Sequence, residues 1–247
     1  AEDAAANLKP GELLILENLR FHEEEIKGDY DFAQKLSKLG DIYVNDAFGT
    51  AHREHASTAT VARFFGDQVA AGYLMKAELD QAARVLENPR RPFTAIMGGA
   101  KVSDKLLLIE NLLPKVDRLL VVGGMAYTFC KAMGGEVGSS LCEEDRLETA
   151  RNLLAKAKDL GVELVIPEDS VIADAFGNDA HRQIAMNHEI PAGWMGLDLG
   201  PKSIQTMVAQ IQDAATILWN GPAGYFENPS FANGSIKIAM KIIDNNK

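Results

Sequence analysis

The segment NDAFGTAHREHAST, residues 45–58, brings basic and imidazole side chains together directly after an apolar run. His52 and His55 lie three residues apart, with Arg53 between them. Three kinds of site fit these residue types: a metal site, a site of histidine catalysis, or a binding site for an anion. No H-E-x-x-H motif or Cys/His cluster accompanies the histidines, which disfavours a metal site. Arg53 favours an anion, because a guanidinium pairs with carboxylate or phosphate through two hydrogen bonds.

A second arginine follows another apolar run. Arg20 lies in NLRFHEEE, residues 18–25, directly after ELLILEN, residues 12–18. We predict strands at 12–18 and 41–45, so that each arginine follows the carboxyl end of a strand. Open parallel sheets bind their ligands at these ends. A single arginine is usually part of a surface ion pair, whereas two at corresponding strand ends favour a shared anion site.

The segment IMGGAKVSDKLLLIENLL, residues 96–113, places a glycine pair between a predicted strand (92–98) and a predicted helix (102–113). The free N–H groups and positive dipole end of such a helix attract an anion. Lys101 and Lys105 are four residues apart and are therefore predicted on one face of its first turns. Cations are disfavoured at that end unless an anion such as phosphate binds there. The alternative is a tight turn with two solvated lysines.

Two further glycine turns follow predicted strands. VVGGMAYTF, residues 121–129, contains Gly123 and Gly124, for which a packing role is as good an explanation as a binding role. ILWNGPAGYFE, residues 217–227, contains Glu227, whose carboxylate could accept hydrogen bonds from a ribose or could simply lie on the surface. Neither a Walker loop nor a G-x-G-x-x-G fingerprint is present. No G-x-S-x-G elbow or Cys–His signature supports covalent catalysis.

Predicted strands and helices alternate along the chain. The strands are expected at 12–18, 41–45, 92–98, 118–124, 162–167, 193–198 and 215–221, and the helices at 30–39, 72–86, 102–113, 126–133, 143–160 and 203–212. The apolar strands are typical of parallel sheets buried on both faces. The alternation therefore predicts an α/β fold with parallel-sheet, Rossmann-like three-layer domains.

The helix that begins near Gly72 is stopped by Asn88–Pro89, and a new strand follows. We interpret residues 71–91 as an interdomain helix and linker. This interpretation divides the chain into a first domain at 1–70 and a second domain at 92–247.

The composition limits the possible partners. The 247 residues include 25 Lys and Arg against 35 Asp and Glu, giving a formal charge of −10. Such a surface does not suit nucleic acid, which requires a basic face. The first residues lack the features of a signal peptide, and the most apolar stretch, 119–133, is too short to span a bilayer. Cys130 and Cys142 fit free thiols in a reducing compartment better than a disulfide framework. We therefore expect a cytoplasmic protein without nucleic-acid or membrane partners.

Seven segments, in order and over nearly the whole chain, together resemble the phosphoglycerate kinase family. They are LLILENLRFHEEE, DIYVNDAFGTAHREHAS, AGYLMKAEL, IMGGAKVSDKLLLIENLL, VVGGMAYTF, GWMGLDLGP and ILWNGPAGYFE. The resemblance implies a two-domain, hinge-bending kinase, usually a monomer. Such an enzyme moves a phosphoryl group between 1,3-bisphosphoglycerate and ADP, giving 3-phosphoglycerate and ATP. It binds the phosphoglycerate on its first domain and Mg-ADP or Mg-ATP on its second, with magnesium held mainly through the nucleotide.

The resemblance also implies roles for individual residues. Arg20 and Arg53 correspond to the basic patch that binds phosphoglycerate, and Lys101, with Arg53, to the catalytic groups that contact the transferred phosphoryl group. Lys105 corresponds to a lysine on the nucleotide phosphates. The adenine pocket would be framed by Gly99, Ala100, Gly123, Gly124, Gly196 and Leu197, while Asn220, Pro222 and Glu227 would lie near the phosphates and ribose. No residue is implied as a protein ligand of a metal.

The chain departs from the family pattern in three places. It lacks the R-x-D-x-N-V-P strand and the S-H-L-G-R-P loop of the first domain, and the late G-G-G-D-[ST] turn of the second. The resemblance is therefore to a central part of the family, with both domains incomplete, and we expect this chain alone to have little or no activity. A nucleotide-binding module without turnover is the first alternative. A Rossmann-type oxidoreductase is the second, disfavoured by the missing fingerprint.

Overall fold

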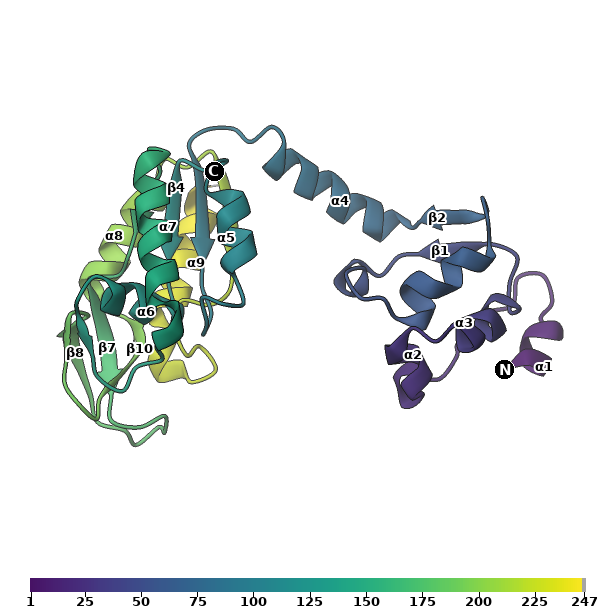
Figure 1. Ribbon diagram of the computed structural model, residues 1–247, viewed down its shortest axis with the longest axis horizontal. Coiled ribbons are helices and arrows are strands. Elements are labelled where there is room, and N and C mark those ends of the chain that lie inside the picture. The colour runs from purple at the N-terminus through teal and green to yellow at the C-terminus, as the bar shows by residue number, and fades with distance from the viewer. Residues whose placement is uncertain (246–247) are drawn as a thin grey trace. The chain divides into compact units, whose positions relative to one another are not determined.

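The computed structural model describes residues 1–245 and divides into two compact units. Unit 1 is Ala1–Arg84, and unit 2 begins at Val85. The order of elements along the chain is shown in Figure 1. Each unit has its own hydrophobic core, so the two are described separately.

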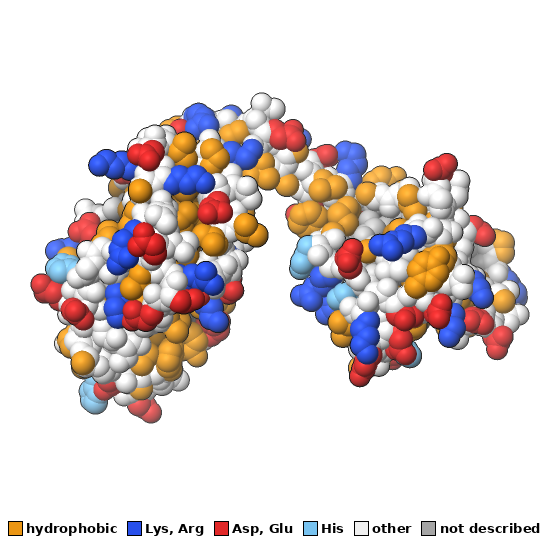
Figure 2. All heavy atoms as spheres, viewed as in Figure 1, with side chains coloured by type: hydrophobic (Ala, Val, Ile, Leu, Met, Phe, Trp, Pro, Cys, Tyr) orange, Lys and Arg blue, Asp and Glu red, His pale blue; other side chains and the backbone are white. Residues whose placement is uncertain are grey.

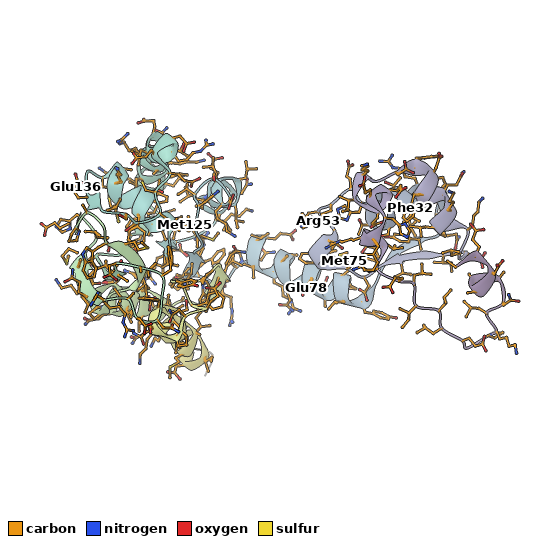
Figure 3. All side chains as sticks on the ribbon, turned by 90° about the horizontal axis from the view of Figure 1, so that it is seen from below. Phe32, Arg53, Met75, Glu78, Met125 and Glu136 are labelled. Atoms are coloured by element: carbon orange, nitrogen blue, oxygen red, sulfur yellow. The ribbon has the colours of Figure 1, made fainter. Side chains whose placement is uncertain are left out.

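Unit 1 is built mainly from short helices around a small core. Its strands β1 (Tyr43–Asn45) and β2 (Val69–Ala71) pair in parallel, with Tyr43 opposite Val69. Its helical elements are α1 (Glu2–Ala6), η1 (Leu19–Phe21), α2 (Glu23–Lys27), α3 (Tyr30–Ser37), η2 (Phe48–Thr50), the π-helical η3 (Ala56–Thr60) and η4 (Val61–Phe64). Helix α4 (Tyr73–Leu86) follows, and its last two residues belong to unit 2. Ala33, Ala56 and Val61 form the core, and Phe32, labelled in Figure 3, packs against it.

The predicted strand at 12–18 is wrong. These residues form neither helix nor strand, and the side chains of Leu13 and Ile15 are 85% and 82% exposed. A strand requires a neighbour that pairs its N–H and C=O groups and covers its apolar face. Within the described part of the chain no strand pairs with this run, so its apolar character does not lead to sheet formation.

A four-stranded parallel sheet organises unit 2. The strand order is β11 (Thr216–Asn220), β3 (Phe93–Met97), β4 (Arg118–Val121) and β6 (Glu163–Val165). All three neighbouring pairs are parallel. The strands predicted at 92–98, 118–124, 162–167 and 215–221 are therefore confirmed, as is their direction.

Helices cover both faces of this sheet. Ala95 and Met97 of β3 pack with α5 (Leu106–Leu112), α6 (Met125–Ala132) and α7 (Leu147–Asp159), which η5 (Glu144–Arg146) precedes. Ile96 points to the opposite face and packs with α8 (Pro201–Ile211) and α9 (Asn233–Asn245), which η6 (Pro229–Phe231) precedes. A strand buried on both faces favours apolar residues at nearly every position, which explains the nearly continuous apolar runs. The predicted three-layer α/β fold is confirmed.

A second sheet in unit 2 is antiparallel. Its order is β10 (Met195–Leu199), β7 (Asp169–Ala173) and β8 (Arg182–Met186), and Figure 1 shows it beneath the helices of the unit. The short strands β5 (Glu136–Val137) and β9 (Glu189–Ile190) pair separately in parallel. The run at 193–198 was predicted as part of a parallel sheet, and this prediction is wrong. An apolar run does not reveal the direction of its partner, and β10 runs against β7.

Several further features bear on the sequence predictions. Among residues 1–245, no helix combines the length and apolarity that crossing a membrane requires. Cys130 and Cys142 are free thiols. Acidic and basic side chains are interspersed over the visible face of each unit in Figure 2. The functional division into residues 1–70, 71–91 and 92–247 stays a prediction.

Candidate functional site

The loops after β3, β4 and β11 meet at the carboxyl end of the parallel sheet. The Gly98 N–H donates to the carbonyl oxygen of Asn220 (2.8 Å), and the Met125 N–H donates to that of Gly99 (3.0 Å). A Cβ on Gly98 would lie 2.2 Å from the carbonyl oxygen of Pro222. Glycine is therefore required at Gly98 by close backbone approach rather than by a special dihedral angle.

Gly123 is constrained in two ways. Its φ of +72° is a conformation that side chains disfavour, and a Cβ there would lie 2.8 Å from both the Gly99 nitrogen and the Pro222 oxygen. The glycine pairs that the sequence presented as separate turns are thus parts of one packed backbone cluster.

A cavity of about 210 Å³ opens against this cluster. Eight of the residues predicted to bind a nucleotide line it: Gly99, Ala100, Gly123, Gly124, Gly196, Leu197, Pro222 and Glu227. Its position at the carboxyl ends of parallel strands is where open α/β sheets bind ligands. The structure thus brings together residues that are spread over 129 positions of the sequence.

Six residues that were not among the predicted site residues complete the lining. They are Tyr127, Leu141, Phe176, Ala223, Gly224 and Tyr225. The rings of Phe176 and Tyr225 pack edge to face, with their centroids 5.6 Å apart. Tyr127 and Tyr225 stand within the glycine segments and could have been found there. Leu141 and Phe176 come from loops that carry no motif, so no pattern in the sequence points to them.

Tyr127 forms part of the cavity wall from α6. Its hydroxyl lies 2.7 Å from the hydroxyl of the buried Ser170, and burial raises the pKa of Tyr127. A Cβ on Gly196 would lie 1.9 Å from the Tyr127 hydroxyl oxygen. Strand β10 can therefore pack this closely against Tyr127 only because residue 196 is a glycine. The side of the cavity formed by Tyr127 is therefore uncharged, and the Tyr127 hydroxyl is already hydrogen-bonded to Ser170.

The two lysines of the GGAK segment are not on one helical face, contrary to the prediction. Residues 102–105 form a turn, in which the Lys105 N–H donates to the Val102 carbonyl oxygen (2.9 Å), and α5 begins only at Leu106. Lys105 is the N-cap of that helix, and its ammonium group donates a hydrogen bond to the side-chain oxygen of Asn220. Lys101 lies before the turn and is exposed. The Ser103 N–H donates to the Glu143 carboxylate (3.1 Å), which stabilises the turn that precedes the helix.

A buried carboxylate lies behind the cavity wall. Asp198 follows the lining residue Leu197 and is 2% exposed. Its Oδ2 accepts a hydrogen bond from the Gly234 N–H (2.9 Å), while Oδ1 has no hydrogen-bond partner among the described residues. Burial raises the pKa of Asp198 to about 6, against the hydrogen bonds that lower it. This carboxylate stabilises the first turn of α9, where a negative charge is favoured by the helix dipole.

The predicted anion-binding arginines lie in unit 1. Arg20 is in η1, where its N–H donates to the side chain of Asn18 (3.0 Å), and it follows no strand, because the strand at 12–18 does not form. Arg53 follows β1 and η2, and Figure 3 shows its side chain in unit 1. Both are exposed, and neither guanidinium forms an ion pair within residues 1–245.

The histidines beside Arg53 differ in their surroundings. His52 is exposed, whereas His55 is buried with its Nδ1 3.9 Å from a carboxylate oxygen of Glu25. Glu25 is 3% exposed and accepts hydrogen bonds from the Ser57 N–H (3.0 Å) and hydroxyl (2.6 Å). His55 therefore has a structural position. No group of three His, Cys, Asp or Glu side chains in the described part of the chain is arranged to hold a metal ion.

A family model described as Phosphoglycerate kinase matches residues 1–247. The chain belongs to this family. It is 54% identical over 238 residues to the chloroplastic phosphoglycerate kinase of Volvox carteri, covering 96% of this chain and 51% of that protein. It is 52% identical over 246 residues to phosphoglycerate kinase of Acidobacterium capsulatum, covering 99% of this chain and 61% of that protein.

Solved phosphoglycerate kinase structures have the same fold. The structure from Coxiella burnetii matches with a TM-score of 0.84 at 40% identity, over 96% of this chain and 61% of that one. The structure from Pyrococcus horikoshii matches with a TM-score of 0.83 at 28% identity, over 99% and 63%. The family and fold predicted from the seven segments are confirmed. The chain spans about half to three-fifths of the length of these relatives, so the activity of whole phosphoglycerate kinase is a proposal for it.

Proposed function

We propose that this chain takes part in the reversible transfer of a phosphoryl group between 1,3-bisphosphoglycerate and ADP, giving 3-phosphoglycerate and ATP. The observation that carries the proposal is the cavity at the carboxyl ends of β3, β4 and β11, with the Lys105–Asn220 pair beside it. Membership of the phosphoglycerate kinase family supports the identity of the reaction. In this assignment residues 92–247 bind the nucleotide, 1–70 bind phosphoglycerate, and 71–91 connect them.

The cavity suits a nucleotide by shape and by chemistry. Bare glycine backbone at Gly99, Gly123 and Gly124 leaves room for a flat base, and the walls are largely apolar. The Lys105 ammonium group lies at the end of the same strands and binds the phosphates, where a fixed cation is most useful. Glu227 lies on the cavity lining and accepts hydrogen bonds from the ribose. Magnesium enters with the nucleotide and neutralises phosphate charge.

Phosphoryl transfer depends on positioning and on positive charge rather than on a covalent intermediate. Lys101 is exposed and makes no hydrogen bond or short ion pair within residues 1–245, so its ammonium group is available to the transferred phosphoryl group. The guanidinium groups of Arg20 and Arg53 likewise form no ion pair within the described residues 1–245, and they bind the phosphoglycerate, with Arg53 also acting in transfer. The protein works as a monomer in the cytoplasm. The cytoplasmic location is proposed from the sequence features named above, and the named relatives include a chloroplastic and a cytosolic form.

A second candidate is a nucleotide-binding chain without turnover. It is favoured because every residue that lines the cavity, and the Lys105–Asn220 pair, lies in unit 2. Both candidates require the same nucleotide site, so binding alone does not separate them.

Calorimetry and a coupled activity assay on the 247-residue chain test the proposal. Saturable binding of MgADP that Lys105→Ala weakens, together with turnover that depends on 3-phosphoglycerate and ATP, supports the kinase. Binding without turnover supports the second candidate for this chain. Absence of any MgADP binding, or binding unaffected by Lys105→Ala, contradicts the nucleotide assignment of the cavity. Titration with NAD serves as the control for an oxidoreductase.

A further inference from the structure

Glu143 holds the turn that carries the two lysines of unit 2. Its Oε2 accepts the Ser103 N–H (3.1 Å), and its Oε1 accepts the Ser103 hydroxyl (2.5 Å). Ser103 lies midway between Lys101 and Lys105, and 40 residues of chain separate it from Glu143. A carboxylate that accepts two hydrogen bonds from one residue fixes both the position and the orientation of that residue.

Glu143 is itself fixed from the core side. Its N–H donates to the hydroxyl of Thr128 (3.1 Å), a residue of α6 that is 1% exposed. Burial alone would raise the pKa of the Glu143 carboxyl, but the hydrogen bonds from Ser103 and the attraction of Lys101 lower it below its ordinary value. The carboxylate is therefore ionised at neutral pH. A chain of contacts runs from the buried helix α6 through Glu143 to the turn that carries the lysines.

The segment that carries Glu143 also reaches the cavity. Leu141, two residues before it, lines the cavity, and its Cδ1 lies 2.9 Å from where a Cβ on Gly124 would stand. One short segment thus contacts both the proposed base pocket and the turn that presents the lysines. A negative charge so close to two phosphate-binding lysines would weaken anion binding if it acted only through its field. Any favourable effect of Glu143 on the site must therefore come from the position in which it holds Ser103.

We propose that Glu143 is a positioning residue for the nucleotide phosphates, which holds Ser103 so that Lys101 and Lys105 face the bound ligand. This inference rests on the proposed nucleotide function of the cavity. Electrostatics alone would predict tighter binding of a phosphate-bearing nucleotide when the negative charge of Glu143 is removed, and this inference predicts the opposite. Removing the charge of Glu143 weakens the binding of a nucleotide that carries phosphates, although a negative charge has been removed from the vicinity of the site.

The test compares Glu143→Gln with Glu144→Gln, the adjacent acidic residue, which pairs with Lys131. Both variants lose one negative charge in the same segment. Calorimetry with MgADP and with adenosine is carried out on the full chain. We expect Glu143→Gln to weaken MgADP binding by about tenfold and adenosine binding by less than about twofold, because only the phosphates meet the lysines. Glu144→Gln leaves both affinities within about twofold of the wild type.

Ser103→Ala provides a second variant in case Glu143→Gln is poorly folded. It removes the hydroxyl donor and keeps the N–H, so a smaller loss in MgADP affinity with unchanged adenosine affinity is expected. Unchanged or increased MgADP affinity in Glu143→Gln overturns the proposal, as does an equal loss for adenosine. If the wild type itself binds no MgADP, the proposed function fails. Hydrogen exchange then decides the role of Glu143: faster exchange of the amides at 102–105 in Glu143→Gln than in Glu144→Gln supports it, and equal exchange overturns it.

Discussion

The ammonium group of Lys105 donates a hydrogen bond to the side-chain oxygen of Asn220, which joins the start of α5 to the carboxyl end of β11. The two residues are 115 positions apart in sequence, but β11 and β3 are neighbours in the sheet, with Asn220 opposite Met97. A flexible lysine is thereby held at the edge of the cavity before any ligand arrives. Holding it there reduces the conformational entropy lost on binding.

Replacement of Asn220 tests this arrangement. Asn220→Ala frees the ammonium group, and we expect it to weaken MgADP binding by about threefold to tenfold, whereas Lys105→Ala removes the cation and weakens it by about tenfold or more. Asn111→Ala, on the exposed face of α5, is the matched control and should have no effect. The double variant should bind no more weakly than Lys105→Ala, since the two residues act together. Fully additive losses would contradict the coupling.

The buried carboxylate of Asp198 predicts a particular dependence of stability on pH. Its pKa in the folded chain is about 6, against an ordinary value of 3.8, so the folded chain binds this proton more tightly than the unfolded chain. The associated stability is complete below about pH 4 and is lost as the pH rises through about 6. Asp198→Asn cannot ionise. The free energy of unfolding of the variant, minus that of the wild type, should therefore rise by up to about 3 kcal/mol between pH 4 and pH 7.5.

Urea unfolding across this pH range measures the difference. Asp213→Asn is the control of opposite sign, because the hydrogen bond from Arg118 lowers the pKa of Asp213. The stability from Asp213 is present above its unfolded pKa of about 3.8 and is lost as the pH falls below that value, so the corresponding difference should stay nearly constant between pH 4 and pH 7.5 and should increase only below about pH 4. A pH-independent difference for Asp198→Asn would show that this carboxyl does not titrate in the folded chain.

Close backbone approach at Gly98 gives a prediction about stability. In Gly98→Ala the new Cβ would lie 2.2 Å from the Pro222 carbonyl oxygen, and backbone cannot move aside as a side-chain tip can. We expect a loss of about 2 kcal/mol or more in the free energy of unfolding. Gly177→Ala is the control, because its Cβ would meet only the Asp179 nitrogen at 3.9 Å, and its loss should stay below about 0.5 kcal/mol. Equal stability of the two variants would contradict the close packing of these loops.

The sequence was informative where a strand is buried on both faces. Residues 93–97 are all buried, and all but Thr94 are apolar, because helices cover both sides of β3; that pattern predicts strand, burial and direction together. Residues 13–16 are also a continuous apolar run, yet no strand pairs with them in the described part of the chain. Whether an apolar run becomes a strand depends on a partner far along the sequence, which periodicity does not reveal.

Residues of the cavity also differ in whether a local requirement or a distant part of the chain places them there. Glycine turns such as Gly98–Gly99 can be recognised because a local backbone requirement selects the residue type. Phe176 and Leu141 reach the cavity through the course of their loops, and nothing in their local sequence requires it. The start of α5 illustrates a third case. A helix was predicted from Val102, but α5 begins only at Leu106, after a turn that is held by a hydrogen bond from Ser103 to Glu143, 40 residues away.

The hydroxyl pair of Tyr127 and Ser170 allows a matched comparison of two tyrosines in the cavity wall. Both Tyr127 and Tyr225 line the cavity, but only the Tyr127 hydroxyl has a hydrogen-bond partner, the buried Ser170, among the described residues. Tyr127→Phe leaves the Ser170 hydroxyl buried and unpaired, so we expect a loss of about 1 to 2 kcal/mol in the free energy of unfolding. Tyr225→Phe should change it by less than about 0.5 kcal/mol.

Thermal and urea unfolding of these variants check the prediction. The double variant Tyr127→Phe with Ser170→Ala removes both partners, and it should recover part of the stability lost by Tyr127→Phe alone, because no unpaired polar group then remains. If Tyr127→Phe and Tyr225→Phe are equally stable, the Ser170 hydroxyl must find another partner when Tyr127 loses its own. The assignment of the Tyr127 side of the cavity as a wall whose polar groups are already hydrogen-bonded would then be contradicted.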